Sequence, residues 1–199
     1  AFVEDPVRIL RTARFQARFA NLGFKIAEPT KALMDLMVAS GEVDSLVPER
    51  VFIELKKALE TPAPYEFVKA LRACGAFARI FPELDRLFNV PLNTFVHPEG
   101  SLGAHMLMVM ERAAALTSDP VIRFSAMTVN LAEGYLTRDA SSNPVASETP
   151  GLRALEQMCH RLRIPSVYSD LSRKVIRCFG TAQRVMSLDA ESLVKLVED

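Results

Sequence analysis

Apolar residues recur every three to four positions in nearly every segment of this chain that lies between glycines and prolines. No stretch shows the sustained alternation of a half-buried strand, and neither Asn-Gly nor Asp-Gly, the commonest hairpin turns, occurs. The 199 residues, 49% of them hydrophobic and 24% charged, are enough to bury a sizeable core. The sequence therefore predicts an all-α, multi-helical fold made of two packed helical subdomains.

The turn-forming residues divide this pattern into individual helices. Asp5-Pro6 predicts the start of a first helix that ends near residue 21, and Thr30 is the predicted N-cap of the second. The pattern lapses at 91–100, which predicts a subdomain boundary, and 137–150 is a predicted surface loop. Further helices are predicted at 48–59, 65–74, 76–88 with a restart at Pro82, 102–117, 120–133, 152–163, 166–186 and 189–198.

Charge and cysteine content limit the possible partners and compartments. The 24 Lys and Arg residues balance the 24 Asp and Glu residues, so a nucleic-acid surface would have to be a local patch. The three cysteines are far apart and form no CxxC pair, which predicts buried thiols in a reducing compartment, the cytoplasm. No apolar run approaches the roughly 18 residues that span a bilayer, so we predict no membrane association.

The first 25 residues carry the densest positive charge. Five basic residues, Arg8, Arg11, Arg14, Arg18 and Lys25, face only Glu4 and Asp5. On a helix Arg11, Arg14 and Arg18 fall on one face, opposite an apolar face. Such a helix can be a solvated amphipathic element whose arginines pair with acids elsewhere, or it can contact phosphates. The periodicity alone favours the first alternative.

A set of short motifs bears on that choice. The chain contains Glu4-Asp5-Pro6-Val7-Arg8, Leu10-Arg11-Thr12-Ala13-Arg14-Phe15, Gly23-Phe24-Lys25-Ile26-Ala27, Glu49-Arg50-Val51 with Glu54, Leu71-Arg72-Ala73-Cys74-Gly75-Ala76, Phe81-Pro82-Glu83 and His97-Pro98-Glu99 followed by Gly103 and His105. In this order they resemble class II tRNA nucleotidyltransferases, the CCA-adding enzymes, and the related bacterial poly(A) polymerases. The resemblance covers roughly the whole chain. It implies a neck helix at 1–25 with the EDxxR motif, an RNA-binding helical body at 26–90 and a degenerate HD-like domain at 91–199.

The resemblance assigns a role to each charged residue of the neck. It implies that Asp5 and Arg8 pair with the incoming base of CTP or ATP, the carboxylate accepting from the exocyclic amine and the guanidinium donating to ring acceptors. Glu4 is expected to orient Arg8, and Arg11 and Arg14 to contact phosphates of nucleotide or tRNA. The remaining two cations are expected to contribute to RNA binding: Arg18 and Lys25. Arg50 and Glu54 are expected to form a helix-supporting ion pair.

The catalytic part of that family has no counterpart in this chain. Transfer in the family needs a nucleotidyltransferase head with a Gly-Ser phosphate loop and an Asp-x-Asp pair that holds Mg²⁺. The sequence has no Asp-x-Asp, and Gly100-Ser101 precedes a predicted helix. We therefore expect the chain alone to be inactive and to be a piece of a CCA-adding enzyme whose partners are tRNA, CTP and ATP.

The HD-like half also departs from its pattern. His105 matches the first metal ligand of an HD phosphohydrolase, but Val129-Asn130 stands where the resemblance places His-Asp. The other histidines, His97 and His160, are scattered along the sequence, so no metal site is predicted. This half is expected to serve structure, to hold tRNA or to form a homodimer.

Three alternatives stay open beside the CCA-adding enzyme. The chain can be part of a poly(A) polymerase, or a non-catalytic helical RNA-binding module without a head. An active metal phosphohydrolase is disfavoured by Val129 and Asn130.

Overall fold

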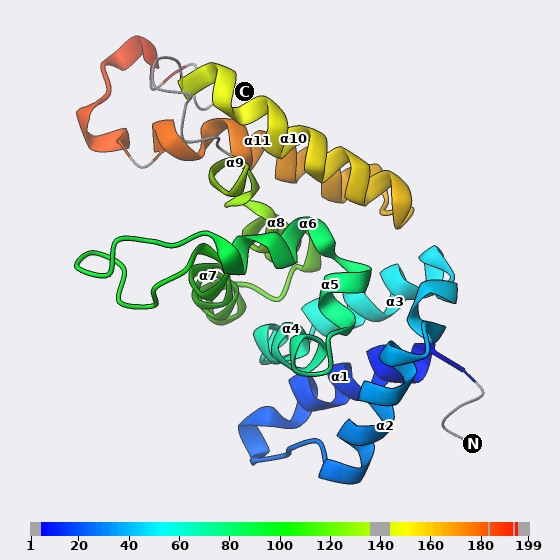
Figure 1. Cartoon of the computed structure of the whole chain (residues 1–199). Coiled ribbons are helices and arrows are strands. Elements are labelled where there is room, and N and C mark those ends of the chain that lie inside the picture. Colours follow the sequence, from blue (N-terminus) through cyan, green and yellow to red (C-terminus); the bar gives the residue numbers. More distant parts are fainter. Residues whose placement is uncertain (1–4, 136–143, 183, 193, 195–199) are drawn as a thin grey trace.

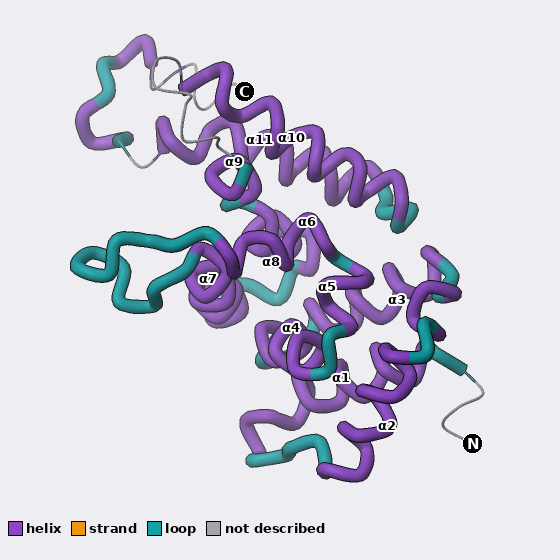
Figure 2. The backbone as a smooth tube through the Cα atoms, in the orientation of Figure 1, coloured by secondary structure: helices purple, strands orange, loops and turns teal. Residues whose placement is uncertain are grey.

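Helices account for nearly all regular structure in the described part of the chain. The computed structural model describes residues 5–135, 144–182, 184–192 and 194, with no side-chain description at 144–149 or 186. Figure 2 shows helices joined by loops, which confirms the predicted all-α, multi-helical fold. The α-helices are α1 (Val7–Phe19), α2 (Glu28–Ala39), α3 (Pro48–Leu59), α4 (Pro64–Ala73), α5 (Ala76–Ile80), α6 (Pro82–Asp85), α7 (Leu102–Leu116), α8 (Pro120–Thr128), α9 (Leu131–Gly134), α10 (Pro144–Arg161) and α11 (Ser166–Ala182).

Proline marks the start of many of these helices, as the sequence indicates. Its ring fixes φ near the helical value, and its missing N–H would have no intrahelical acceptor at that position. Pro48, Pro64 and Pro120 each occupy the first turn of a helix, and Pro82 restarts the chain as α6 after α5. These boundaries confirm the predicted helix starts at residues 48 and 120 and the predicted restart at Pro82.

Two boundaries differ from prediction. Helix α2 begins at Glu28 with extended Ala27 before it, so the prediction that Thr30 is the N-cap is wrong. A proline in the first turn, Pro29, starts this helix instead. Helix α10 begins at Pro144, so the loop predicted at 137–150 is wrong for residues 144–150, while residues 137–143 lie outside the described residues. The predicted helix at 189–198 falls partly outside them too.

The apolar face of α1 is the centre of the first half. Ile9, Leu10, Ala13 and Ala17 are fully buried, and the helix packs against α3 and α4. Figure 1 shows α1 beside α4 in the lower part of the molecule, with α2 next to it. Burying these side chains fixes the rotation of α1 about its axis, so its charged residues must face α3 or solvent.

The second half packs as helix pairs on the same core. Helix α8 contacts α7 and α11, and α10 contacts α9 and α11. Figure 1 shows α10 and α11 side by side at the top of the molecule. Among the described residues one hydrophobic cluster runs from Ile9 in α1 to Ile176 in α11. A loop occupies 91–100 as predicted, yet the core is continuous past it, and the three-part division of the chain stays a prediction.

A buried arginine connects the two halves. Arg123 of α8 is 5% exposed, and its guanidinium donates to four backbone carbonyls. Two of them, Leu59 and Thr61, lie at the end of α3 at 2.5 Å and 2.7 Å. The others, Ala114 and Thr117, lie at the end of α7 at 2.9 Å and 2.6 Å. The last carbonyls of a helix have no hydrogen-bond donor within the helix, so the guanidinium supplies one. A cation at this end also interacts favourably with the negative end of the helix dipole.

We expect the Arg123→Met variant to lose about 3 kcal/mol of unfolding free energy, because it leaves buried carbonyls without donors. Urea denaturation followed by circular dichroism measures the loss. Arg112→Met, which changes an exposed arginine on α7, is the matched control and should stay within about 0.5 kcal/mol of the parent. Equal midpoints for the two variants would contradict the role given to Arg123.

Candidate nucleotide-binding and RNA-binding site

Asp5 stands immediately before the first turn of α1, where the sequence places it. Its Oδ1 atom accepts the backbone N–H of Val7 at 3.1 Å, so the carboxylate caps the helix start. Its Oδ2 atom accepts from Nη2 of Arg50, on α3, at 2.6 Å. An ionised carboxylate has about four lone-pair positions. The two donors hold the group in place and leave acceptor positions for a ligand.

The Asp5–Arg50 pair corrects one expectation. The predicted ion pair between Arg50 and Glu54 is wrong, because Arg50 binds Asp5 and Glu54 binds Arg14. The hydrogen bond from Arg50, followed by that from the Val7 N–H, holds the pKa of Asp5 below its ordinary value. The charge of Arg8, in the first turn of α1, lowers the pKa further. Asp5 therefore stays ionised, and an acceptor only, at neutral pH.

Arg14 lies between α1 and α3 rather than in solvent. Its Nε atom donates to Oε2 of Glu54 at 2.6 Å, and the two side chains are 12% and 9% exposed. Lys57 Nζ lies 3.8 Å from the other oxygen of the same carboxylate. This nearly buried guanidinium, whose Nε atom is paired, is placed to fix α1 against α3. Phosphate contact by Arg14 stays a prediction.

The other two arginines of the predicted basic face, Arg11 and Arg18, are exposed. Arg18 and Arg14 line an open hollow of 710 Å³ together with Lys57, Phe19 and Thr61. Arg18 also lies over the ring of Phe19, 5.8 Å from its centroid. The sequence does not predict Lys57 at this surface, because Lys57 belongs to α3 and only helix packing brings it beside α1.

The other residues predicted for the site are Glu4, Arg8 and Lys25. Arg8 is half-buried on the first turn of α1, and Glu4 lies outside the described residues. Lys25 lines a second hollow, of 500 Å³, on another side of α1 with Lys31, Lys69 and Tyr65. Arg18 and Lys25 therefore line two different hollows, which share Asn21 in their walls.

The residues at the HD positions are now part of the core. Val129 is 5% and Asn130 2% exposed. The amide nitrogen of Asn130 donates to Glu133 at 3.3 Å, and its Oδ1 atom is the one buried side-chain polar atom without a partner among the described residues. His97 and His105 are separated in the sequence, but the fold brings both into contact with Glu99.

Comparison with known proteins gives one family. A family model described as the probable RNA and SrmB-binding site of polymerase A matches residues 23–88. Proteins named multifunctional CCA protein from Thioalkalivibrio sulfidiphilus and Methylococcus capsulatus are each 47% identical over 198 residues, and one from Ralstonia nicotianae is 46% identical. Each alignment covers 100% of this chain and 48%, 47% and 46%, respectively, of the relative.

The chain belongs to the CCA protein family. The identity extends over its whole length, so both the neck and the half that follows 91–100 are shared with these relatives. The chain spans about half the length of the CCA proteins it matches. None of the helices within the described residues is both long and apolar enough to cross a bilayer.

Replacing Arg50 by Gln removes the strongest donor to Asp5, so the pKa of Asp5 should rise toward 3.8, its ordinary value. Because folding lowers this pKa, the ion pair stabilises the fold above the unfolded-state value. That contribution is lost as the pH falls through the folded-state value. Carboxyl carbon NMR over an acid titration measures the shift. Arg72→Gln, which breaks the exposed pair with Asp85, should leave the Asp5 titration unchanged.

Proposed function

We propose that this chain selects the nucleotide and binds tRNA within a CCA-adding tRNA nucleotidyltransferase. The observation that carries the proposal is the carboxylate of Asp5, which two donors hold at the start of α1 with Arg8 one turn away. Membership of the CCA protein family supports it. The proposal covers the complete protein, in which a separate head would catalyse the transfer.

Base selection follows from the donors and acceptors of the two side chains. Asp5 accepts from the exocyclic amine that C and A both carry, and Arg8 donates to ring acceptors of the same base. G and U present the opposite groups at these positions, which leaves a buried donor or acceptor unpaired at a cost of about 1–3 kcal/mol. Glu4 orients Arg8 in this scheme. The protein side chains then act in place of a template base.

The exposed cations of the neck and α3 hold the RNA. Arg18 and Lys57 contact phosphates at the 710 Å³ hollow, and Lys25 extends the contact at the second hollow. Arg11, exposed on the same helix, adds a further phosphate contact. Arg14, which Glu54 neutralises, positions α1 for them. Phosphate contacts of this kind release counterions, so they make binding depend on salt concentration.

The metal ion, the substrates, the compartment and the oligomeric state concern the complete protein rather than the Asp5 site. Mg²⁺ acts in the head, where it would activate the primer hydroxyl and stabilise the leaving pyrophosphate. The substrates are CTP, ATP and tRNA, the compartment is the cytoplasm, and residues 91–199 are the predicted contact of a homodimer.

The deciding experiment uses the complete protein with its head. Incubation with tRNA that lacks its 3′ end, CTP, ATP and Mg²⁺ is followed by sizing of the product at single-nucleotide resolution. A product that ends at CCA supports the proposal. Absence of extension, or of an encoded head, would favour an RNA-binding module instead.

A poly(A) polymerase is the second candidate, because the family model at 23–88 is described for polymerase A. The same assay separates the two enzymes by product length and composition. A long tail made only of A would transfer the assignment to the polymerase.

Arg8→Ala in the complete enzyme should raise misincorporation of G and U by about 10- to 100-fold, because it removes one side of the base pair mimic. The affinity for tRNA should change little. Competition assays with mixed nucleotides measure the first effect and filter binding the second. Unchanged selectivity with weakened tRNA binding would contradict the assignment and make Arg8 a phosphate ligand.

Arg18→Met should weaken tRNA binding by a similar factor for all tRNAs and reduce the slope of log K against log salt by about 1. The measurement is tRNA binding to this chain across a salt series. Arg153→Met, an exposed change on α10, is the control with the parent slope. If both variants keep the parent slope, α1 does not contact phosphate at Arg18.

A further inference from the structure

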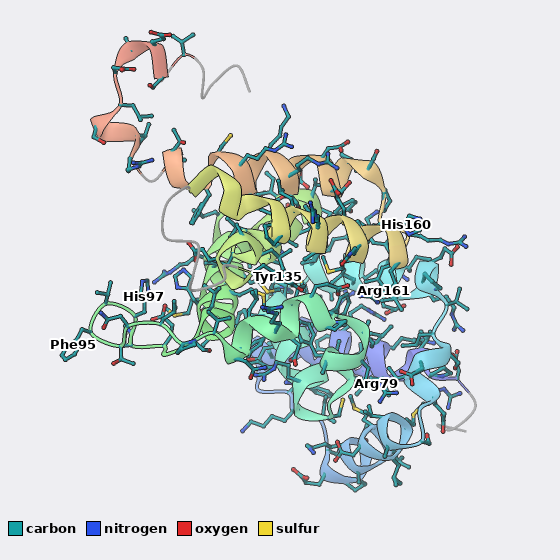
Figure 3. The ribbon with its side chains drawn as sticks, turned by 45° about the horizontal axis from the view of Figure 1, so that its top comes forward. Arg79, Phe95, His97, Tyr135, His160 and Arg161 are labelled. Atoms are coloured by element: carbon teal, nitrogen blue, oxygen red, sulfur yellow. The ribbon has the colours of Figure 1, made fainter. Side chains whose placement is uncertain are left out.

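Two histidines and a glutamate converge where the loop after the first half enters α7. Oε1 of Glu99 lies 2.6 Å from Nδ1 of His105 and 3.2 Å from Nδ1 of His97. The two imidazole rings meet edge to face with centroids 5.3 Å apart. One ligand atom from each of the three residues lies within 4.8 Å of the others, and no other such group occurs in the described chain. Figure 3 shows His97 on the projecting loop, near Phe95.

Backbone hydrogen bonds hold this loop in shape. The His97 N–H donates to the Asn93 carbonyl at 2.8 Å, and the Gly100 N–H donates to the His97 carbonyl at 3.0 Å. Gly100 has a φ of 79°, which turns the chain back toward α7 in a conformation that glycine adopts without strain. Ser101 then caps α7 by accepting the Ala104 N–H at 3.2 Å. The three side chains are therefore brought together before any ligand binds.

The burial of the cluster is uneven. The side chain of Glu99 is 9% exposed, whereas those of His97 and His105 are 39% and 28% exposed. The carboxylate thus lies at the base of the cluster and both imidazoles border solvent. An ion bound between them would have access to water on its outer side.

The ligand types and spacing suit a first-row transition metal. Two imidazoles and one carboxylate form an established ligand set for zinc, in which water takes the fourth position. With metal–ligand bonds of roughly 2.0–2.2 Å, tetrahedral geometry places neighbouring ligand atoms roughly 3.3–3.5 Å apart. The 3.2 Å between His97 and Glu99 is close to this value, and the 2.6 Å to His105 has to lengthen by less than 1 Å. All three ligand atoms lie within 4.8 Å of one another, so rotation of the partly exposed imidazole rings has to bring the two ring nitrogens to a similar spacing.

We propose that His97, Glu99 and His105 bind one divalent first-row transition-metal ion, with Zn²⁺ as the reference ion. Water completes the coordination from the exposed side. The alternative for the same contacts is a cluster in which both imidazoles only donate to Glu99. Zinc binding distinguishes the metal site from the hydrogen-bonded cluster.

This ligand set is different from the one implied by the HD-like positions. It takes two ligands, His97 and Glu99, from the loop before α7 and only His105 from α7 itself. Asn130 is not needed, because it is 2% exposed and its amide nitrogen is bound to Glu133. Loss of the His-Asp dipeptide therefore leaves this cluster intact.

The test measures zinc binding to the purified chain by equilibrium dialysis against a zinc buffer, with the bound metal counted per chain. We expect one ion per chain. His97→Ala should lower the affinity by at least the roughly 10- to 100-fold that loss of an outer-shell partner costs. Glu99→Gln keeps a hydrogen-bond acceptor in the loop but is a much poorer ligand, so it should lower the affinity as well.

His160→Ala is the matched control. His160 is exposed on α10, and Figure 3 shows it at the opposite side of the molecule from His97. Circular dichroism before metal addition verifies that each variant is folded. Cobalt substitution adds a direct readout, because Co²⁺ in a tetrahedral site absorbs visible light that the His97→Ala protein should lack.

Two outcomes would overturn the proposal. One is the absence of stoichiometric zinc in the parent chain, which leaves a hydrogen-bonded cluster. The other is equal zinc affinity in the parent and His97→Ala, whatever the His160→Ala result, which places the metal elsewhere. One bound ion that depends on His97 and Glu99 but not on His160 supports it.

Discussion

The burial of the Arg123 guanidinium between two helix ends is the constraint on which this fold depends. A buried cation is tolerated only where acceptors replace the water it loses, and here four carbonyls from α3 and α7 do so. The same bonds supply donors to carbonyls that helix ends leave without partners. Because α3 belongs to the first half and α7 to the second, this one side chain links the two halves. The continuous apolar core can then form around that junction.

Two ion pairs join the N-terminal segment of the chain to α3. Arg14 of α1 binds Glu54 of α3 at 2.6 Å. Arg50 of α3 binds Asp5, just before α1, also at 2.6 Å, so each segment supplies one cation and one carboxylate. The buried pair fixes the helix, and the more exposed pair fixes the carboxylate at its start. Asp5 is thereby aimed by a residue 45 positions later in the chain. In the proposed function, base selection depends on the packing of α3 as much as on the EDxxR motif itself.

In the second half, the residues at the HD-like positions are buried, whereas the loop before α7 carries an ordered cluster of polar side chains. Val129 and Asn130 are buried. The Oδ1 atom of Asn130 is buried without a hydrogen-bond partner among the described residues. The loop before α7 keeps its capped, hydrogen-bonded form and still collects His97, Glu99 and His105. A ligand set can therefore be local to a loop and independent of the residues whose loss is visible in the sequence.

The helical class, most helix starts and the family follow from the sequence, because period, proline position and motif order are local properties of the chain. The sequence also places Asp5 at a helix start, where the Val7 N–H binds it. Which charges meet depends instead on how the helices pack: Glu54 with Arg14 instead of Arg50, Lys57 beside Arg18, and His97 with His105 around Glu99. Spacing along one helix predicts neighbours three or four residues apart, but partners on different elements depend on how those elements pack. Pairing between charges is therefore determined by the buried core, which orients each helix before its polar face finds a partner.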